Sequence, residues 1–168
     1  RLYDEILEIV PSVQLIWNDV SGVMDGQLAS LLTIEAPNCH YIFSHSGVTN
    51  REQSAHHLDF MVESSDMVKT VCEHFAAASR QFAKWGVEAR RVIYDPCLGF
   101  SKSYEANWQL INGVELLAKS VAPNSLLMGL SRKSFLRERL IRELGLIDIS
   151  REELIRLSDY LLCSLTST

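Results

Sequence analysis

Four short apolar segments alternate with segments of helical periodicity along the chain, and this alternation most constrains the fold. The apolar segments are hydrophobic throughout, which is typical of parallel strands covered by helices. The helical segments between them are long enough to act as crossover connections. The predicted strands are Val13–Trp17, His40–Ser44, Arg91–Pro96 and Leu126–Leu130.

The order of elements allows two architectures. The first is a (β/α)8 TIM barrel of which the chain carries about four consecutive βα units, and the alternative is an open doubly wound parallel sheet. A complete barrel needs about 250 residues, whereas the chain has 168. We therefore expect one barrel domain over residues 1–168, incomplete at both ends. The predicted helices are Leu2–Val10, Asp25–Leu32, Asp66–Trp85, Glu105–Val121, Ser134–Leu144 and one from Ser150 to about Ser164.

Composition argues against several classes of protein. The formal net charge of −5 disfavours a general nucleic-acid binder, which is normally basic. No apolar run approaches the length of a membrane span. The four cysteines are far apart and include no Cys-x-x-Cys pair, which disfavours a disulfide framework and a structural zinc site. These features predict a cytoplasmic protein with reduced thiols.

Polar or charged residues follow each of the four predicted strands. In both architectures ligands bind at the carboxyl ends of parallel strands, so these residues are expected on one common rim. Amides, carboxylates and cations that converge on a rim predict a ligand site. The residues are Asn18, Asp19 and Ser21, then Ser44, His45 and Ser46, then Asp95, Phe100 and Lys102, and finally Ser131, Arg132, Lys133 and Ser134.

Asp95 and Asn18 have the chemistry that suits a flat heterocycle. A carboxylate at a strand end can accept two parallel N–H bonds from an amidine-like edge, such as that of guanine or a pterin. The amide of Asn18 can both donate and accept along such an edge. Each residue also has a structural explanation, as a helix cap or arginine partner for Asp95 and as a turn residue for Asn18.

The remaining strand ends supply cations and a ring. Lys133 can reach a ring carbonyl oxygen, and Arg132 can face an anion or stack on a flat ring. Phe100 can form one wall of a slot. The alternatives are a solvated loop for the two cations and ordinary packing for Phe100. His45 is a candidate donor or acid, but a lone histidine at a strand end more often has a structural role.

Three motifs resemble those of dihydropteroate synthase. They are Asn-Asp-Val-Ser-Gly at 18–22, Asp-Pro-x-x-Gly-Phe-x-Lys at 95–102 and Gly-x-Ser-Arg-Lys-Ser at 129–134. The resemblance implies a (β/α)8 barrel that condenses 6-hydroxymethyl-7,8-dihydropterin diphosphate with 4-aminobenzoate. The products are 7,8-dihydropteroate and pyrophosphate, and Mg²⁺ assists. It also implies a homodimer without nucleic-acid or membrane partners.

The resemblance also assigns roles to individual residues. Asn18 and Asp95 would hold the pterin ring, with Lys133 on its carbonyl and ring-nitrogen side. Asp95 and Lys133 are then the catalytic residues, because fixing the ring while the diphosphate leaves is catalysis by orientation. The other substrate-binding residues are Phe100 near the pterin pocket, and Ser131 and Arg132 on the aminobenzoate side.

The chain departs from the family pattern in several places. Cys97 and Ser101 stand where the family usually has glycine, and Ser46 stands where a methionine is common. The family's first strands and its final Arg-x-His segment have no counterpart in this sequence. Two alternatives therefore stay open: a non-catalytic pterin-binding module, and a pterin-dependent methyltransferase domain, which has no need of a Ser-Arg-Lys-Ser segment.

Overall fold

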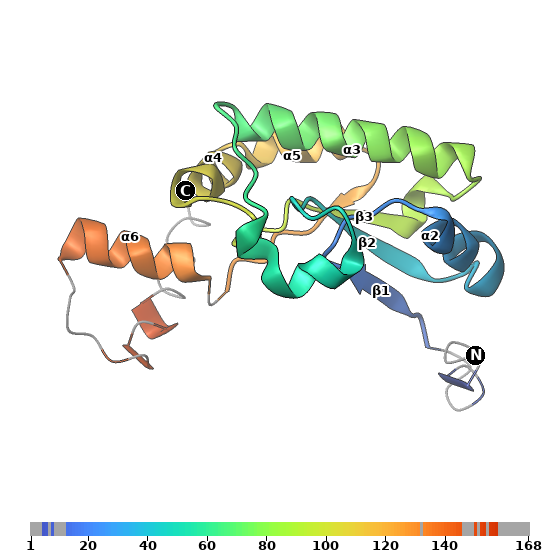
Figure 1. The fold of residues 1–168 in the computed structure, drawn as a ribbon, viewed down its shortest axis with the longest axis horizontal. Coiled ribbons are helices and arrows are strands. Elements are labelled where there is room, and N and C mark those ends of the chain that lie inside the picture. Colours follow the sequence, from blue (N-terminus) through green and yellow to red (C-terminus); the bar gives the residue numbers. More distant parts are fainter. Residues whose placement is uncertain are drawn as a thin grey trace.

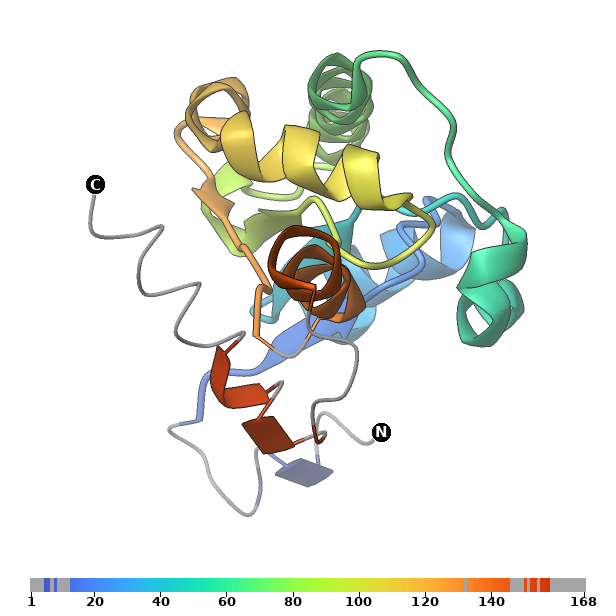
Figure 2. The ribbon, with the colours of Figure 1, turned by 90° about the vertical axis from the view of Figure 1, so that its left-hand side faces the viewer.

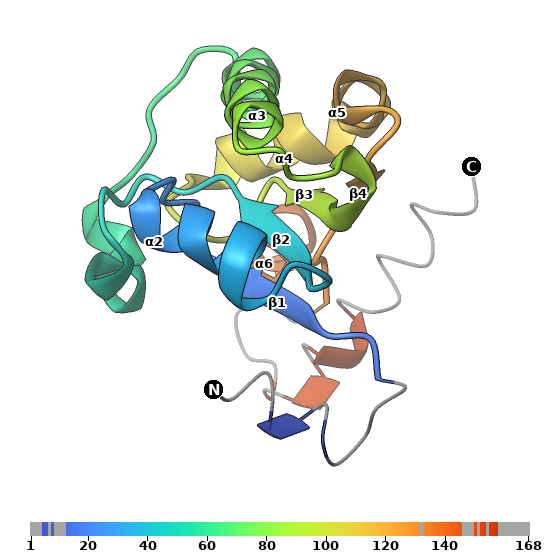
Figure 3. The same cartoon turned by 90° about the vertical axis from the view of Figure 1, so that its right-hand side faces the viewer.

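A sheet of four parallel strands forms the centre of the computed structural model. The structure describes residues 5, 6, 8, 13–131, 133–145, 150, 152–153 and 155–157. The strands are β1 (Ile16–Asp19), β2 (His40–Ser44), β3 (Val92–Asp95) and β4 (Ser125–Leu126). Helices α3 (Met67–Lys84), α4 (Tyr104–Asn112) and α5 (Val114–Val121) form a layer over one face of this sheet (Figures 1 and 3).

The strand order distinguishes the two predicted architectures. Each strand pairs in parallel with the next strand along the chain, giving the order β1-β2-β3-β4. A doubly wound sheet reverses its strand order at a switch point and carries helices on both faces. The described residues instead form consecutive βα units wound in one direction. This arrangement confirms the partial barrel and does not fit the doubly wound alternative.

Local signals set several helix boundaries where the sequence predicts them. Helix α2 (Gly26–Ser30) begins after Asp25, whose Oδ1 accepts a hydrogen bond from the Leu28 amide at 2.9 Å. Asp66 caps α3 in the same way, and α6 (Ser134–Leu144) ends at Gly145 with a left-handed φ of 63°. The predicted helices Leu2–Val10 and Ser150–Ser164 lie largely outside the described residues. Among the helices that the structure does describe, none has both the length and the apolar character needed to cross a bilayer.

Other boundaries differ from the sequence prediction. The predicted helix Glu105–Val121 is two helices that meet at Gly113, where an added Cβ would lie 2.5 Å from a methyl carbon of Val68 on α3. Close packing between the helices therefore requires glycine at the break. Strand β1 begins three residues later than predicted, so Asn18 lies inside it. Strand β4 pairs over only two residues, rather than over Leu126–Leu130.

The segment after β2 contains a 3-10 helix, η2 (Arg51–Asp59), which the sequence analysis did not predict. Its first turn is fixed by a reciprocal cap: the Asn50 side chain accepts from the Gln53 amide, and the Gln53 side chain accepts from the Asn50 amide. Figure 2 looks at the carboxyl ends of the strands and shows η2 beside them. This element therefore belongs to the rim on which ligands are expected.

The register of the sheet separates its side chains into two faces. Because residues paired across parallel strands point to the same side, Tyr41 shares a face with Val92, and Phe43 shares it with Tyr94. These four side chains are at most 2% exposed and pack under α3, where Phe75 and Phe82 contact the Phe43 ring. The opposite face carries Asn18, Ile42, Ser44, Ile93 and Asp95.

Candidate functional site

Asp95 is the last residue of β3 and lies at the rim, as predicted. Asp95 is buried, and its Oδ1 accepts a 2.7 Å hydrogen bond from the Cys97 amide. Within the described residues, no hydrogen bond reaches the second carboxylate oxygen. Burial raises the pKa of Asp95, and the Cys97 hydrogen bond and the positive charges of Lys133 and Lys102 act against that rise. The carboxyl group is thus fixed by one oxygen and can accept N–H bonds with the other.

The loop after β3 has an unusual backbone conformation. Gly99 has φ of 80°, and the non-glycine residues Cys97 and Ser101 both have φ of 54°. A left-handed conformation costs a non-glycine residue roughly 1–2 kcal/mol. The chain therefore pays this conformational cost at two positions of the loop. Other contacts must therefore stabilise the loop.

Lys102 supplies one set of those contacts. Its side chain is buried, and Nζ donates to the carbonyl oxygens of His45 (2.8 Å), Phe100 (3.0 Å) and Cys97 (3.3 Å). Burial lowers the pKa of Lys102 to about 8, although the neighbouring Cys97 and Asp95 favour its charged form. Its ammonium group joins the end of β2 to the loop after β3. Lys102 was expected on the rim, and the structure gives it this internal role.

Asn107 on α4 supplies a second set. Its Oδ1 accepts a 2.7 Å hydrogen bond from the Gly99 amide, and its Nδ2 donates to the Ser103 carbonyl at 2.7 Å. The side chain is only 2% exposed. Sequence analysis did not assign this contact, because the asparagine lies one helical turn inside α4 and eight residues from its partner.

Lys133 and Phe100 lie together at the rim. The Lys133 Nζ lies 4.9 Å from the centre of the Phe100 ring, within the range of a cation–π contact. A Cβ added at Gly99 would lie 3.3 Å from Lys133 Cδ, so the lysine stem crosses the loop closely. The ammonium is near enough to influence the pKa of Asp95, yet no direct ion pair joins these two described side chains. That the acid and the lysine face each other across one pocket stays a prediction.

Asn18 lies on the same face of the sheet as Asp95 and is exposed. Asn18 pairs with Ile42, and Asp95 pairs with Ser44, so the asparagine lies two residues deeper along the sheet. Standard strand spacings put the two backbones about 10 Å apart across the sheet and about 7 Å apart along it. That separation leaves room for a flat ligand that both side chains contact.

Two further predicted residues come from the turn after β4. Ser131 lies exposed in this turn, just before Lys133. Arg132 lies outside the described residues, so its assignment to the aminobenzoate side stays a prediction.

Asp19 points to the helix-covered side of β1 and joins a network instead of the rim. Its Oδ1 accepts from the amide and hydroxyl of Ser21, and Oδ2 accepts from the Tyr41 hydroxyl at 2.7 Å. Arg51 on η2 donates to Asp19 Oδ2 from Nε at 3.3 Å, and also donates to Asp25 and to the Val23 carbonyl. Arg51 therefore fixes η2 against the end of β1.

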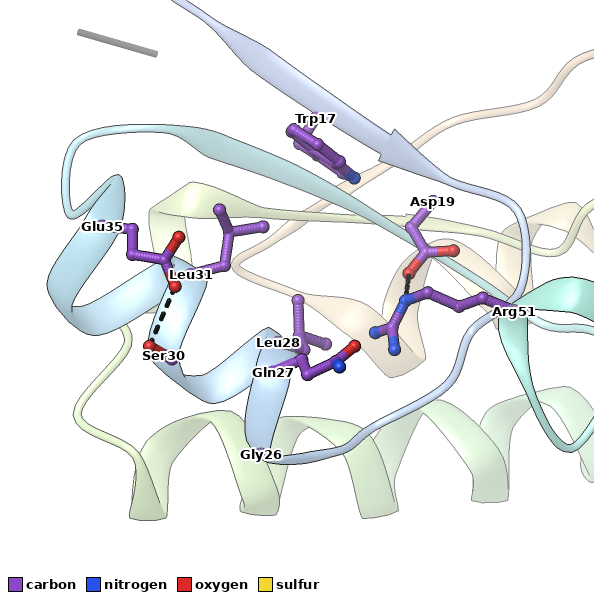
Figure 4. A pocket seen from close by; sticks show the side chains of 9 residues that line it. All are labelled: Trp17, Asp19, Gly26, Gln27, Leu28, Ser30, Leu31, Glu35 and Arg51. Carbon is purple, nitrogen blue, oxygen red and sulfur yellow. Dashed lines mark hydrogen bonds and ion pairs between the residues drawn. The ribbon is translucent and has the colours of Figure 1, made fainter. Parts of the chain in front are cut away.

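A cavity of about 550 Å³ lies between β1 and α2 (Figure 4). Its walls include Trp17, Leu28 and Leu31, and the ion pair between Asp19 and Arg51 lies at one end. Trp17 and Asp19 alternate with Asn18 along β1, so the cavity opens on the opposite face from Asn18 and Asp95. It does not bring the predicted site residues together.

His45 has a structural role. The His45 and His74 rings meet edge to face, with centroids 4.9 Å apart. The His45 Nδ1 and the His74 Nε2 are buried without a hydrogen-bond partner in the described part of the chain. Burial, together with the charges of Lys102 and His74, lowers the pKa of His45 to about 2. A histidine that stays neutral on the helix-covered side of the sheet is not the acid of this site.

A family model described as pterin binding enzyme matches residues 10–155. The chain belongs to this family. The match covers all three motifs that resemble dihydropteroate synthase and all the strands. It confirms the family resemblance inferred from the residues at the strand ends.

Individual relatives agree with this assignment. The chain is 31% identical to the dihydropteroate synthase of Mycobacterium leprae (strain TN) over 119 residues, which are 71% of this chain and 39% of that protein. It is 29% identical to the mitochondrial folate synthesis bifunctional protein of Pisum sativum over 147 residues, 81% of this chain and 27% of that protein. The chain thus spans well under half the length of these curated relatives.

Solved structures share the fold. Dihydropteroate synthase from Thermus thermophilus in complex with 6HMPPP superposes with a TM-score of 0.64 and 23% identity, over 98% of this chain and 59% of that one. The same enzyme in complex with 4-aminobenzoate gives a TM-score of 0.64 and 21% identity, over 97% and 61%. These matches support the assignment of the four strands to a barrel.

Proposed function

We propose that the protein is a dihydropteroate synthase that condenses 6-hydroxymethyl-7,8-dihydropterin diphosphate with 4-aminobenzoate. The observation that carries this proposal is that the carboxylate of Asp95, whose pKa burial raises, and the Lys133 ammonium, whose charge opposes that rise, both lie at the strand ends of a chain in the pterin binding enzyme family. The M. leprae relative named as a dihydropteroate synthase supports the choice of reaction.

In the proposed reaction, the amine nitrogen of 4-aminobenzoate forms a bond to the exocyclic methylene carbon of the pterin. The bond between that carbon and the diphosphate oxygen breaks, and the nitrogen loses one proton. The products are 7,8-dihydropteroate and pyrophosphate. No covalent bond to a protein side chain is needed, so the contribution of the residues is to bind and orient the ring.

Asp95 and Asn18 would bind the edges of the pterin ring. The free carboxylate oxygen of Asp95 accepts N–H bonds from the amidine-like edge, and burial makes these bonds stronger than they would be in water. The Asn18 amide lies on the same face and completes the polar edge of the pocket.

Lys133 and Phe100 would form the opposite wall. The ammonium group donates to the carbonyl and ring-nitrogen side of the pterin, while the Phe100 ring lies beside it as an apolar surface. A cation here also favours the negative charge that develops as the diphosphate leaves. On the aminobenzoate side, Ser131 and Arg132 remain proposed contacts.

Mg²⁺ is proposed as the ion that assists departure of the diphosphate. Among the described residues, no group of three or more His, Cys, Asp or Glu side chains is arranged to hold a metal ion. The described part of the chain thus offers no such protein metal site, and no step above depends on the ion.

Oligomeric state and compartment are also proposals. We propose a homodimer in the cytoplasm, on the resemblance of the motifs to dihydropteroate synthase. The pea relative is named as mitochondrial, so the compartment needs its own test. Sedimentation velocity would measure the first property, and cell fractionation would measure the second.

Asp95→Asn tests the proposed function. The substitution keeps the size of the side chain but puts an N–H₂ donor where an acceptor is required, so we expect pterin affinity and condensation rate to fall about 100-fold or more. Calorimetry with a pterin and a pyrophosphate-release assay would measure the two quantities.

The matched control is Asp59→Asn, which removes an exposed carboxylate from η2. We expect this variant to retain wild-type affinity and rate. Unchanged activity in Asp95→Asn would refute the role of Asp95. Pterin binding by the wild type without condensation would instead favour the non-catalytic module, and methyl transfer would favour the methyltransferase.

A further inference from the structure

His57 on η2 makes three contacts with the loop after β3. Its Nδ1 accepts a hydrogen bond from the Ser101 amide at 3.3 Å, and its carbonyl oxygen accepts from the Ser101 hydroxyl at 3.0 Å. Its ring also lies against the Phe100 ring, with centroids 4.3 Å apart. The two segments are 44 residues apart in sequence, so these contacts join separate parts of the rim.

The contacts stabilise a residue whose backbone is strained. Ser101 has φ of 54°, which costs a serine roughly 1–2 kcal/mol relative to an ordinary conformation. Its amide and hydroxyl bind His57, and its carbonyl oxygen accepts a 2.8 Å hydrogen bond from the Val62 amide. The amide and hydroxyl of Ser101 are therefore held by His57 on η2, and its carbonyl by Val62 shortly after η2, which offsets the cost of its conformation.

The η2 segment is itself fixed at both ends. Arg51 binds Asp19 and Asp25 at its beginning. After η2 the backbone passes very close to Gly47, because a Cβ added there would lie 2.0 Å from the Phe60 carbonyl oxygen. His57 therefore contacts the loop from a segment that other residues hold in place.

His57 also lies next to the proposed wall of the pterin pocket. Phe100 contacts the His57 ring and the Lys133 ammonium, so the aromatic ring links the histidine to the lysine. Since Nδ1 accepts a hydrogen bond, the ring proton of neutral His57 resides on Nε2. Burial and the charges of Lys133 and Lys102 lower the pKa of His57, which favours this neutral form.

We infer that His57 is a positioning residue that fixes Phe100 and Ser101, and through Phe100 the Lys133 ammonium, for binding of the pterin diphosphate. The inference rests on the proposed function for its substrate. In this role His57 does not contact substrate itself. Substitution of His57 should therefore weaken binding of the substrate that meets Lys133 and Phe100, and not binding of 4-aminobenzoate.

Three substitutions separate the contacts of His57. His57→Ala removes both the ring and the acceptor, His57→Asn keeps an acceptor near the Nδ1 position, and His57→Phe keeps the ring. We expect His57→Ala to raise the KM for the pterin diphosphate about tenfold while leaving the KM for 4-aminobenzoate unchanged. The Asn and Phe variants should each recover part of this loss, because each restores one of the two contacts.

The matched control is His56→Ala, which removes the exposed neighbouring imidazole and should leave both KM values unchanged. An unaltered KM for the pterin diphosphate in folded His57→Ala overturns the inference. Equal rises in both KM values would also overturn it, because they indicate general loss of structure. If the Ala variant does not fold, the Asn and Phe variants still decide between these outcomes.

A measurement on the Ser101 amide separates failure of this inference from failure of the proposed function. Hydrogen exchange at this amide, followed by NMR without substrate, should be faster in His57→Phe than in the wild type and near the wild-type rate in His57→Asn. An exchange rate that His57→Phe leaves unchanged refutes the positioning contact, even if the protein catalyses the condensation. A wild type without condensation activity refutes the proposed function and leaves this test intact.

Discussion

The two faces of the sheet differ in what surrounds them. On the helix-covered face, Tyr41, Phe43 and Tyr94 are almost completely buried and contact one another and α3 through their rings. On the opposite face, Asn18 is exposed and Asp95 keeps one carboxylate oxygen available. The same four strands therefore present an apolar packing surface on one side, and on the other a face on which Asn18, Ser44 and Asp95 lie among isoleucines.

The comparison indicates where stability and binding arise. Apolar burial is the dominant favourable contribution to folding, so substitutions on the helix-covered face should act on stability. Asn18 on the open face is exposed, so its substitution should act on ligand affinity. The loop after β3 joins the two faces, because Lys102 and Asn107 hold it from inside the protein while Asp95 and Phe100 face the rim.

Phe43→Ala should have the largest effect. The Phe43 ring is fully buried and contacts Tyr41, Phe75, Phe82 and Tyr94, so its removal leaves a cavity in the core. We expect the free energy of unfolding to fall by about 3–5 kcal/mol, with pterin affinity unchanged in the molecules that remain folded. Urea unfolding and calorimetry would measure the two quantities. Leu116→Ala, which truncates an exposed leucine on α5, should change stability by less than about 0.5 kcal/mol.

Lys102→Met should have an intermediate effect on both properties. Three carbonyl oxygens lose their donor, two of them in buried contacts, so we expect a loss of about 2–4 kcal/mol in unfolding free energy. The loop should also shift, which would weaken pterin binding in the same variant. Lys119→Met on α5 removes an exposed lysine and serves as the control. A variant that loses stability and retains full pterin affinity would contradict the link between the two faces.

Asn18→Ala should have the smallest effect on stability. Its side chain is exposed on the open face, so the unfolding free energy should change by less than about 0.5 kcal/mol. Loss of one polar contact should weaken pterin binding by roughly five- to tenfold. Thermal unfolding and calorimetry, compared with Asn38→Ala in the turn before β2, would test this separation. A large loss of stability would show that Asn18 supports the fold.

The sequence predicts those elements that local signals define. Strand β2 has the predicted bounds, and α3 and α6 begin and end near residues whose chemistry caps a helix, namely Asp66 and Gly145. The break at Gly113 and the 3-10 helix η2 were not predicted, because they depend on contacts with residues far away in sequence. At Gly113 the deciding neighbour is Val68, on another helix.

The same distinction applies to the site. Asp95, Phe100 and Lys133 lie at or after strand ends, and the order of elements already implies that parallel strands end on one rim. The roles of Lys102, Arg51 and His57 depend on partners 57, 32 and 44 residues away. A buried lysine next to three carbonyl groups has no local sequence signal. The left-handed conformations of Cys97 and Ser101, which show that the loop needs other support, appear only in the structure.

Lys102 has a role that monovalent cations fulfil in other proteins, where carbonyl oxygens converge on a bound K⁺ or Na⁺. Here the positive charge is covalently attached to the chain, so the loop needs no bound alkali ion to hold these carbonyl oxygens together. Its shape should therefore be independent of the alkali ion in the buffer. Exchanging K⁺ for Na⁺ would leave intact the geometry that surrounds Asp95.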